Sequence, residues 1–200
     1  MLKSYYRVGV VEAGCDEAGR GCLAGPVFAA AVILPARFRN KWLNDSKLLT
    51  PEVREALRRV IEKKSISFGV GMADEKEIDR INIVNASFLA MSRAIGKLDP
   101  VPAHLLIDGN RFISAVKIPS ICIVNGDGLY ASIAAASVLA KTYRDDFMYR
   151  LHEEYPRYGW KTNKGYATGF HREAIRKFGP TEYHRRSFNL IDTQLDLDLF

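Results

Sequence analysis

The chain has 200 residues, 48% of them hydrophobic, which is enough to bury one core in a single domain. Lys and Arg number 29 against 23 Asp and Glu, and a formal net charge of +6 suits a polyanionic partner without establishing one. Three cysteines without a CxxC pair or a histidine cluster make a zinc site or a disulfide framework unexpected. With no signal-peptide pattern and no apolar run near the roughly 20 residues of a membrane helix, we expect a soluble, cytoplasmic monomer.

Strand and helix patterns alternate along most of the chain. Apolar runs predict strands over residues 7–13, 27–34, 66–72, 104–107 and 118–124. Helices are predicted from Thr50-Pro51 onward, over 74–98, over 130–155 and around 171–178. This order predicts an α/β fold in which helices flank a central sheet, with a helical C-terminal part from about residue 150. We expect one domain over residues 1–190 and a separate tail over 191–200.

Acidic residues occur where predicted strands end. Asp16-Glu17 follows the first predicted strand among glycines that let the chain bend, and a bend is expected because adjacent acids on a regular strand point to opposite faces. Asp108 follows an apolar run directly, at a sheet edge of the kind where α/β proteins place ligands. From these residues alone, a solvated acidic turn and an Asx turn at Asp108-Gly109 remain alternatives.

A further acid lies on the predicted helix 130–155. Ser137, Lys141 and Asp145 are spaced four apart, so their side chains share one helix face. On their own, Lys141 and Asp145 form no more than a solvated ion pair. If this face meets the sheet-edge acids, however, the carboxylates would repel one another without cations. Mg²⁺ or Mn²⁺ prefers oxygen ligands and, held in pairs, suits phosphodiester hydrolysis.

A series of motifs resembles ribonuclease HII, the bacterial type 2 ribonuclease H. The opening segment reads GCDEAGRG over residues 14–21, followed by LAGPV over 23–27. The further landmarks, in the same order as in that family, are 44–47, 107–109, 126–127 leading into 131–141, 144–145, 164–168 with His171, and 184–188. The resemblance covers about residues 7–190. It implies a ribonuclease H-like fold with a mixed sheet and hydrolysis of the RNA strand of RNA–DNA hybrids. It also implies nicking 5′ of single ribonucleotides in duplex DNA, giving 5′-phosphate and 3′-hydroxyl ends.

The resemblance also assigns roles by position. The implied metal-binding and catalytic acids are Asp16, Glu17, Asp108 and Asp145, with Asp127 as the competitor for the fourth place. Gly19, Arg20 and Gly21 resemble the element that recognises the 2′-hydroxyl, the group that separates RNA from DNA. Tyr166 matches the tyrosine that packs on the deoxyribose 3′ of the scissile ribonucleotide. The expected phosphate contacts are Lys47, Arg20, Lys141 and Arg144, and the sequence departs from many relatives in having Leu48 rather than a second lysine after Lys47.

The tail alternates acids and leucines. Gln194, Leu197, Leu199 and Phe200 resemble the peptide by which bacterial replication proteins bind the sliding clamp; the alternative is an amphipathic segment that packs back on the domain. Two other functions also remain open for the whole chain. One is a ribonuclease H that acts only on longer hybrids, and the other is a module that binds hybrids without catalysis.

Overall fold

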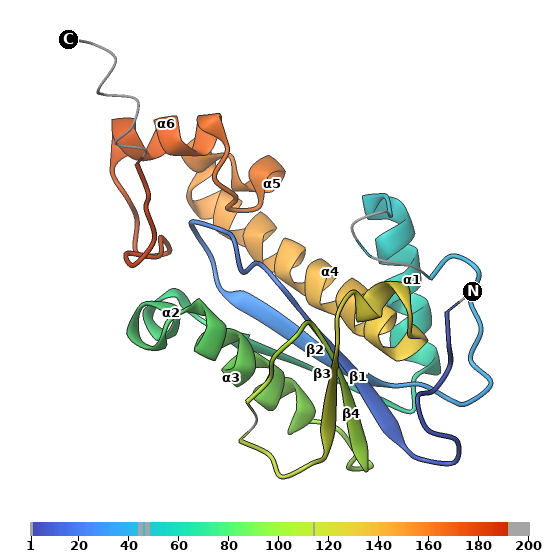
Figure 1. Cartoon of the computed structure of the whole chain (residues 1–200). Helices are drawn as coiled ribbons and strands as arrows, with labels where there is room; N and C mark the ends of the chain where they lie inside the picture. The colour runs from blue at the N-terminus through green and yellow to red at the C-terminus, as the bar shows by residue number, and fades with distance from the viewer. Residues whose placement is uncertain (1, 44–45, 47–48, 114, 192–200) are drawn as a thin grey trace.

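The structure, a computed structural model, describes residues 2–43, 46, 49–113 and 115–191. Their strands form one five-stranded sheet in the order β3-β2-β1-β4-β5 (Figure 1). The strands are β1 (Glu12–Ala18), β2 (Val27–Ile33), β3 (Ser67–Ala73), β4 (His104–Asp108) and β5 (Ser120–Ile123). β2 is antiparallel to β1 and β3, whereas β4 is parallel to β1 and β5. The sheet is therefore mixed, which confirms the predicted fold class.

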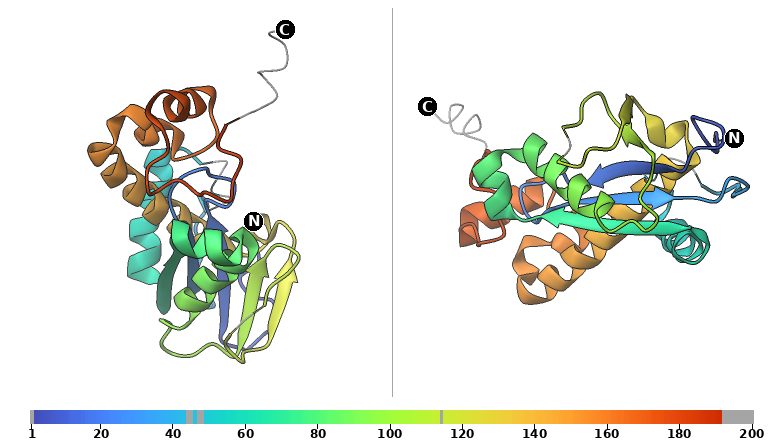
Figure 2. Two further views of the ribbon diagram at one scale, coloured as in Figure 1. Left: turned by 90° about the vertical axis from the view of Figure 1, so that its left-hand side faces the viewer. Right: turned by 90° about the horizontal axis from the view of Figure 1, so that it is seen from below.

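Helices cover both faces of the sheet (Figure 2). The helices are α1 (Pro51–Lys64), α2 (Glu75–Ile81), α3 (Ile83–Ile95), α4 (Ala131–Glu154), α5 (Trp160–Asn163) and α6 (Gly169–Phe178). α1 and α4 pack on one face, and α2 and α3 pack on the other. α4 continues past the sheet to α5 and α6, which form the helical C-terminal part as predicted (Figure 1). No helix among the described residues is both long and apolar enough to cross a membrane.

Two predicted elements have different bounds. The first strand begins at Glu12, not at residue 7, and runs through Ala18, because its pairing with β2 continues to the rung between Ala18 and Phe28. The segment predicted as helical over 74–98 is two helices, which meet at Asn82. The backbone of Asn82 has a φ of 65°, and its side chain caps α3 by accepting hydrogen bonds from two backbone N–H groups of the first turn.

The close approach of α4 to β1 depends on small residues. The first half of α4 is rich in buried alanine. On the strand side, Gly14 faces the helix: a Cβ added there would lie 2.2 Å from the carbonyl carbon of Ser132 and 2.3 Å from the nitrogen of Ile133. Only glycine fits this contact, because heavy atoms in van der Waals contact stand well over 3 Å apart. The face of α4 that carries Ser137 and Lys141 is thus held against the end of β1.

Candidate active site

Two acids become neighbours through the parallel register of β1 and β4. Cys15 pairs with Ile107, so the next residues, Asp16 and Asp108, stand side by side at the carboxyl ends of their strands. Asp16 is buried, and its Oδ1 accepts a hydrogen bond from the Glu17 backbone N–H at 2.7 Å. Asp108 Oδ1 accepts one from the Gly126 N–H at 2.7 Å. Asp108 thus lies at the sheet edge, as its place after an apolar run predicts.

The carboxylate of Asp16 is buried beside other acids. Burial raises the pKa of Asp16 well above its usual value, and the negative charges of Glu17 and Asp108 raise it further. A hydrogen bond with the Ser137 hydroxyl and one with the Glu17 backbone act in the opposite direction. A buried carboxylate among like charges is costly unless a cation joins it. The electrostatics of this edge therefore favour the binding of a cation.

Glu17 reaches the same place without the bend expected from the sequence. Glu17 pairs with Ala29 on β2, and the pairing of β1 with β2 stays regular up to Ala18. The two side chains are therefore not brought to the same face by a bulge at Asp16 or Glu17. Both acids nevertheless line one pocket, because the strand ends one residue later and the chain turns over the site. The Glu17 carboxylate also accepts a hydrogen bond from the Arg20 guanidinium at 3.0 Å.

A pocket of about 270 Å³ collects most of the predicted site residues. Its lining consists of Asp16, Glu17, Ala18, Gly19, Arg20, Gly21, Ser46, Asp108, Ser137, Lys141 and Tyr166. Five separate parts of the chain thus meet here: the end of β1 with its following loop, the segment before α1, the end of β4, the middle of α4, and the segment between α5 and α6. Among the described residues of the predicted set, Arg144 and Asp145 do not line this pocket.

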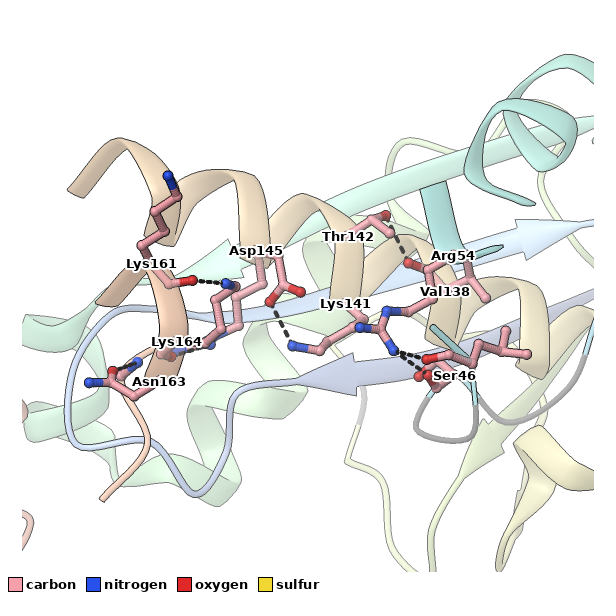
Figure 3. A network of polar contacts seen from close by, with 12 residues as sticks. Ser46, Arg54, Val138, Lys141, Thr142, Asp145, Lys161, Asn163 and Lys164 are labelled. Carbon is pink, nitrogen blue, oxygen red and sulfur yellow. Dashed lines mark hydrogen bonds and ion pairs between the residues drawn. The ribbon is translucent and has the colours of Figure 1, made fainter. Parts of the chain in front are cut away.

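Asp145 lies one helical turn after Lys141 and is paired with it. The Lys141 Nζ donates to Asp145 Oδ1 at 2.6 Å, as Figure 3 shows. The burial of Lys141 lowers the pKa of its amine, while the charge of Asp145 opposes that shift. In this arrangement the lysine neutralises the aspartate. Engagement of Asp145 with a metal ion would require this ion pair to open.

Asp127, the competitor for the fourth place, is buried in the short 3₁₀ turn Gly126–Gly128. Its Oδ1 accepts a hydrogen bond from the Gly128 N–H at 3.0 Å. Over residues 2–43, 46, 49–113 and 115–191, no three Asp, Glu, His or Cys side chains are gathered so that they could hold a metal ion as they stand. Three or more of these acids could therefore share one ion only after their side chains rotate.

The expected phosphate contact from Arg144 is wrong. Arg144 is 1% exposed, and its guanidinium donates to the carbonyl oxygens of Pro26, Lys164 and Ala24 at 3.0, 2.8 and 3.1 Å. Gly19 packs directly on this side chain: with a φ of 95°, a Cβ there would lie 2.0 Å from Arg144 Nε. Arg144 therefore supports the chain next to the pocket instead of reaching a substrate.

A loop residue at the pocket is held from α4 and α1. Ser46 Oγ and Ser137 Oγ are 2.8 Å apart in a buried hydrogen bond. The Arg54 guanidinium donates to the carbonyl oxygens of Ser46 and Leu49 at 2.8 and 2.5 Å (Figure 3). The sequence argument gave neither Ser46 nor Arg54 a role of its own. Lys47, an expected phosphate contact, lies outside the described residues.

Tyr166 lies at the rim of the pocket; the buried His171 binds its backbone carbonyl, and the buried His184 contacts His171. Trp160 donates to His171 Nε2 at 2.9 Å, so the proton of His171 is on Nδ1, which donates to the Tyr166 carbonyl at 2.9 Å. The Thr181 N–H donates to His184 Nδ1 at 2.9 Å, so His184 carries its proton on Nε2, 3.2 Å from His171 Nε2. Burial lowers the pKa of both histidines, that of His184 to about 4.

The sequence matches the model of one protein family over most of its length. The family is described as Ribonuclease HII, and the match covers residues 13–191. The chain belongs to the ribonuclease HII family. The Ribonuclease HII of Bacteroides thetaiotaomicron is 60% identical over 199 residues, covering 99% of this chain and 100% of that protein. That of Christiangramia forsetii is 57% identical over 197 residues, covering 98% and 100%. The chain is thus a ribonuclease H, as the motifs predict.

Solved structures of an RNase HII and of an RNase HIII have the same fold as this chain. The ribonuclease HII of Archaeoglobus fulgidus, solved in complex with PCNA, superposes with a TM-score of 0.76 at 24% identity, covering 94% of this chain and 99% of that chain. A ribonuclease HIII called Bst-RNase HIII, solved in complex with Mn²⁺, gives a TM-score of 0.70 at 18% identity, covering 94% and 70%. At such identities the likeness is one of fold.

Proposed function

We propose that this ribonuclease HII hydrolyses the RNA strand of hybrids with the help of divalent ions held by Asp16, Glu17, Asp108 and Asp145. The observation that carries the proposal is the buried Asp16 carboxylate, which has two further acids beside it in one pocket. Oxygen ligands at such a site fit Mg²⁺ or Mn²⁺. When bound, a pair of such ions supplies an activated water and neutralises charge on the phosphodiester.

The protein's own groups prepare this chemistry. Ser137 donates to Asp16 and favours its ionised form, as a ligand requires. Glu17 and Asp145 each begin in an ion pair, with Arg20 and Lys141 respectively. If metal binding releases these ion pairs, Arg20 and Lys141 would be free to contact phosphates of the substrate. Such contacts position the duplex.

The proposal extends to nicking 5′ of a single ribonucleotide embedded in duplex DNA, leaving 5′-phosphate and 3′-hydroxyl ends. The support is Tyr166, which is 44% exposed at the pocket rim, so that its ring is available to stack on a sugar 3′ of the cut. The test is a duplex with one ribonucleotide, compared with a duplex containing a longer RNA tract, at several Mg²⁺ and Mn²⁺ concentrations. We expect both to be cut; cutting of the longer tract alone would favour the enzyme that acts only on longer hybrids.

A matched pair of variants separates catalysis from binding. Asp108→Asn keeps the size and the acceptor for the Gly126 N–H but removes a metal-binding charge, so we expect cleavage to fall by about 10²-fold or more with little change in duplex affinity. Asp99→Asn, on a loop between α3 and β4, serves as the control. Full cleavage by Asp108→Asn would contradict the assignment, and a wild-type protein that binds hybrids without cutting them would favour the binding module.

A second proposal concerns the tail, which lies outside the described residues. We propose that Gln194, Leu197, Leu199 and Phe200 bind a replication sliding clamp. The support is the sequence pattern, together with the Archaeoglobus fulgidus relative, which was solved with PCNA. Truncation after residue 193 should abolish clamp binding while cleavage of a free duplex continues. Undiminished clamp binding by the truncated protein would remove the proposal.

A further inference from the structure

Arg185 lies beneath the loop that follows β1. Its side chain is fully buried, and all its hydrogen bonds go to carbonyl oxygens of this loop. It donates to Gly19 O at 2.7 Å, to Arg20 O at 2.8 Å, and to Gly25 O at 2.9 and 2.7 Å. One guanidinium therefore binds both ends of the loop 19–25.

These bonds fix the direction of two backbone donors. In a planar trans peptide, the C=O of one residue and the N–H of the next point in opposite directions. Because Gly19 O and Arg20 O both point to Arg185, the N–H groups of Arg20 and Gly21 both point away from it. Neighbouring carbonyls of an extended chain alternate in direction, whereas these two point the same way because the chain turns at Arg20. Residues 19–21 line the pocket, so two successive donors are presented together on its side.

Arg185 is itself held firmly from two sides. Its backbone N–H donates to Leu23 O at 2.9 Å, and the Gly25 N–H donates to Tyr183 O at 2.9 Å, so this segment pairs with the loop it supports. On the next residues, Asp79 of α2 accepts hydrogen bonds from the backbone N–H groups of Arg186 and Ser187, each at 2.9 Å. The loop position is thus coupled through Arg185 to a helix on the far face of the sheet.

Lysine cannot reproduce this support. Burial lowers the pKa of Arg185 to about 10, so its guanidinium remains charged at neutral pH. Its nitrogens spread over a planar fork and reach three carbonyl oxygens, whereas the donors of lysine sit on one nitrogen. A lysine at this position would keep the charge but hold one end of the loop at a time.

We propose that Arg185 is a positioning residue for ribose recognition: it holds the loop so that the Arg20 and Gly21 N–H groups meet the 2′-oxygen of the ribonucleotide at the cut. This inference rests on the proposed function. Reading of the 2′-hydroxyl by residues 19–21 is what the family resemblance implies, and the inference adds the residue that holds their backbone donors in place. Arg185 touches no reacting atom and acts through the loop.

The test combines one change in the protein with one change in the substrate. Wild type and Arg185→Lys are compared under single-turnover conditions on duplexes with one ribonucleotide and on duplexes with a 2′-fluoro nucleotide at that position. We expect Arg185→Lys to cut the ribonucleotide substrate about 10-fold more slowly, the equivalent of one hydrogen bond, and the 2′-fluoro substrate at nearly the wild-type rate. The preference for the ribonucleotide would then shrink by the same factor. Equal slowing on both substrates, or no slowing, would overturn the inference.

Loss of stability alone is controlled by Arg93→Lys. Arg93 also donates through several bonds, to Met72 O at 2.8 Å and to Glu77 at 2.8 and 2.7 Å, but these bonds go to β3 and α2 and not to the loop 19–25. We expect this variant to keep the wild-type preference. If Arg185→Lys does not fold, amide exchange of the wild type decides: the Arg20 and Gly21 amides should become protected by the ribonucleotide duplex and not by the all-DNA duplex. Equal protection by both duplexes would overturn the inference, whereas a wild type that cuts neither substrate would refute the proposed function instead.

Discussion

Replacing Gly14 with alanine should damage both the stability and the activity of the protein. The added methyl would lie 2.2 Å from the carbonyl carbon of Ser132, so β1 and α4 must separate by about 1 Å to restore ordinary contact. Forcing an extra carbon into a packed interior costs about 1–3 kcal/mol, and the contact here is with backbone, which cannot rotate away. The same displacement moves Ser137 and Lys141 away from Asp16, and misplacement by about 1 Å can lower a rate by about 10²-fold.

Two measurements on the same protein check this reasoning. Urea unfolding gives the stability, and single-turnover cleavage of a hybrid under conditions where the protein is folded gives the activity. Gly169→Ala is the matched control, because a Cβ at Gly169, the first residue of α6, meets nothing within 4 Å. We expect the control to be unchanged in both. A Gly14→Ala protein with wild-type stability and rate would show that the contact between β1 and α4 does not set the site.

Three further predictions concern charge. The pKa of His184 is lowered from 6.5 to about 4, so the folded state binds the proton less readily than the unfolded state; stability should fall by about 2–3 kcal/mol as the pH drops from 6.5 to 4, and His184→Gln should flatten this slope in pH-dependent unfolding. Asp16→Asn, in metal-free protein at neutral pH, should unfold at a higher temperature than wild type while losing cleavage, because a buried charge is removed from beside like charges; an unchanged melting temperature would count against that repulsion. Lys141→Met should lower the Mn²⁺ concentration at the midpoint of a binding titration by freeing Asp145, whereas equal midpoints would show that the ion pair does not compete with metal.

The sequence predicted the parts of the site that depend on local pattern. An apolar run ending in Asp108 indicates a buried strand with an acid at its edge, and the structure has it there. The spacing of Lys141 and Asp145 predicts a shared helix face, and the two side chains form an ion pair. The family motifs predicted the fold because the whole series follows the order of the chain.

What the sequence did not predict depends on contacts between distant residues. Arg144 and Arg185 look like surface cations in a basic protein, yet both are buried, and most of the carbonyl oxygens that they bind belong to residues more than a hundred positions away. No periodicity marks such residues. A signal was available in the family motifs 144–145 and 184–188, which contain these two arginines. The start of β1 was missed for a similar reason: its length is set by the partners on both sides.

The placement of Asp16 beside Asp108 rests on the rungs of one parallel strand pair, not on the chain that joins them. The loops between these residues can therefore gain or lose residues without altering the acid pair, provided that β1 and β4 keep their alignment. A slip of a single residue would have the opposite effect, because it turns every side chain of a strand to the other face and would aim Asp108 at the α3 layer. Length variation within this family should accordingly be tolerated in the loops and excluded from the two strands.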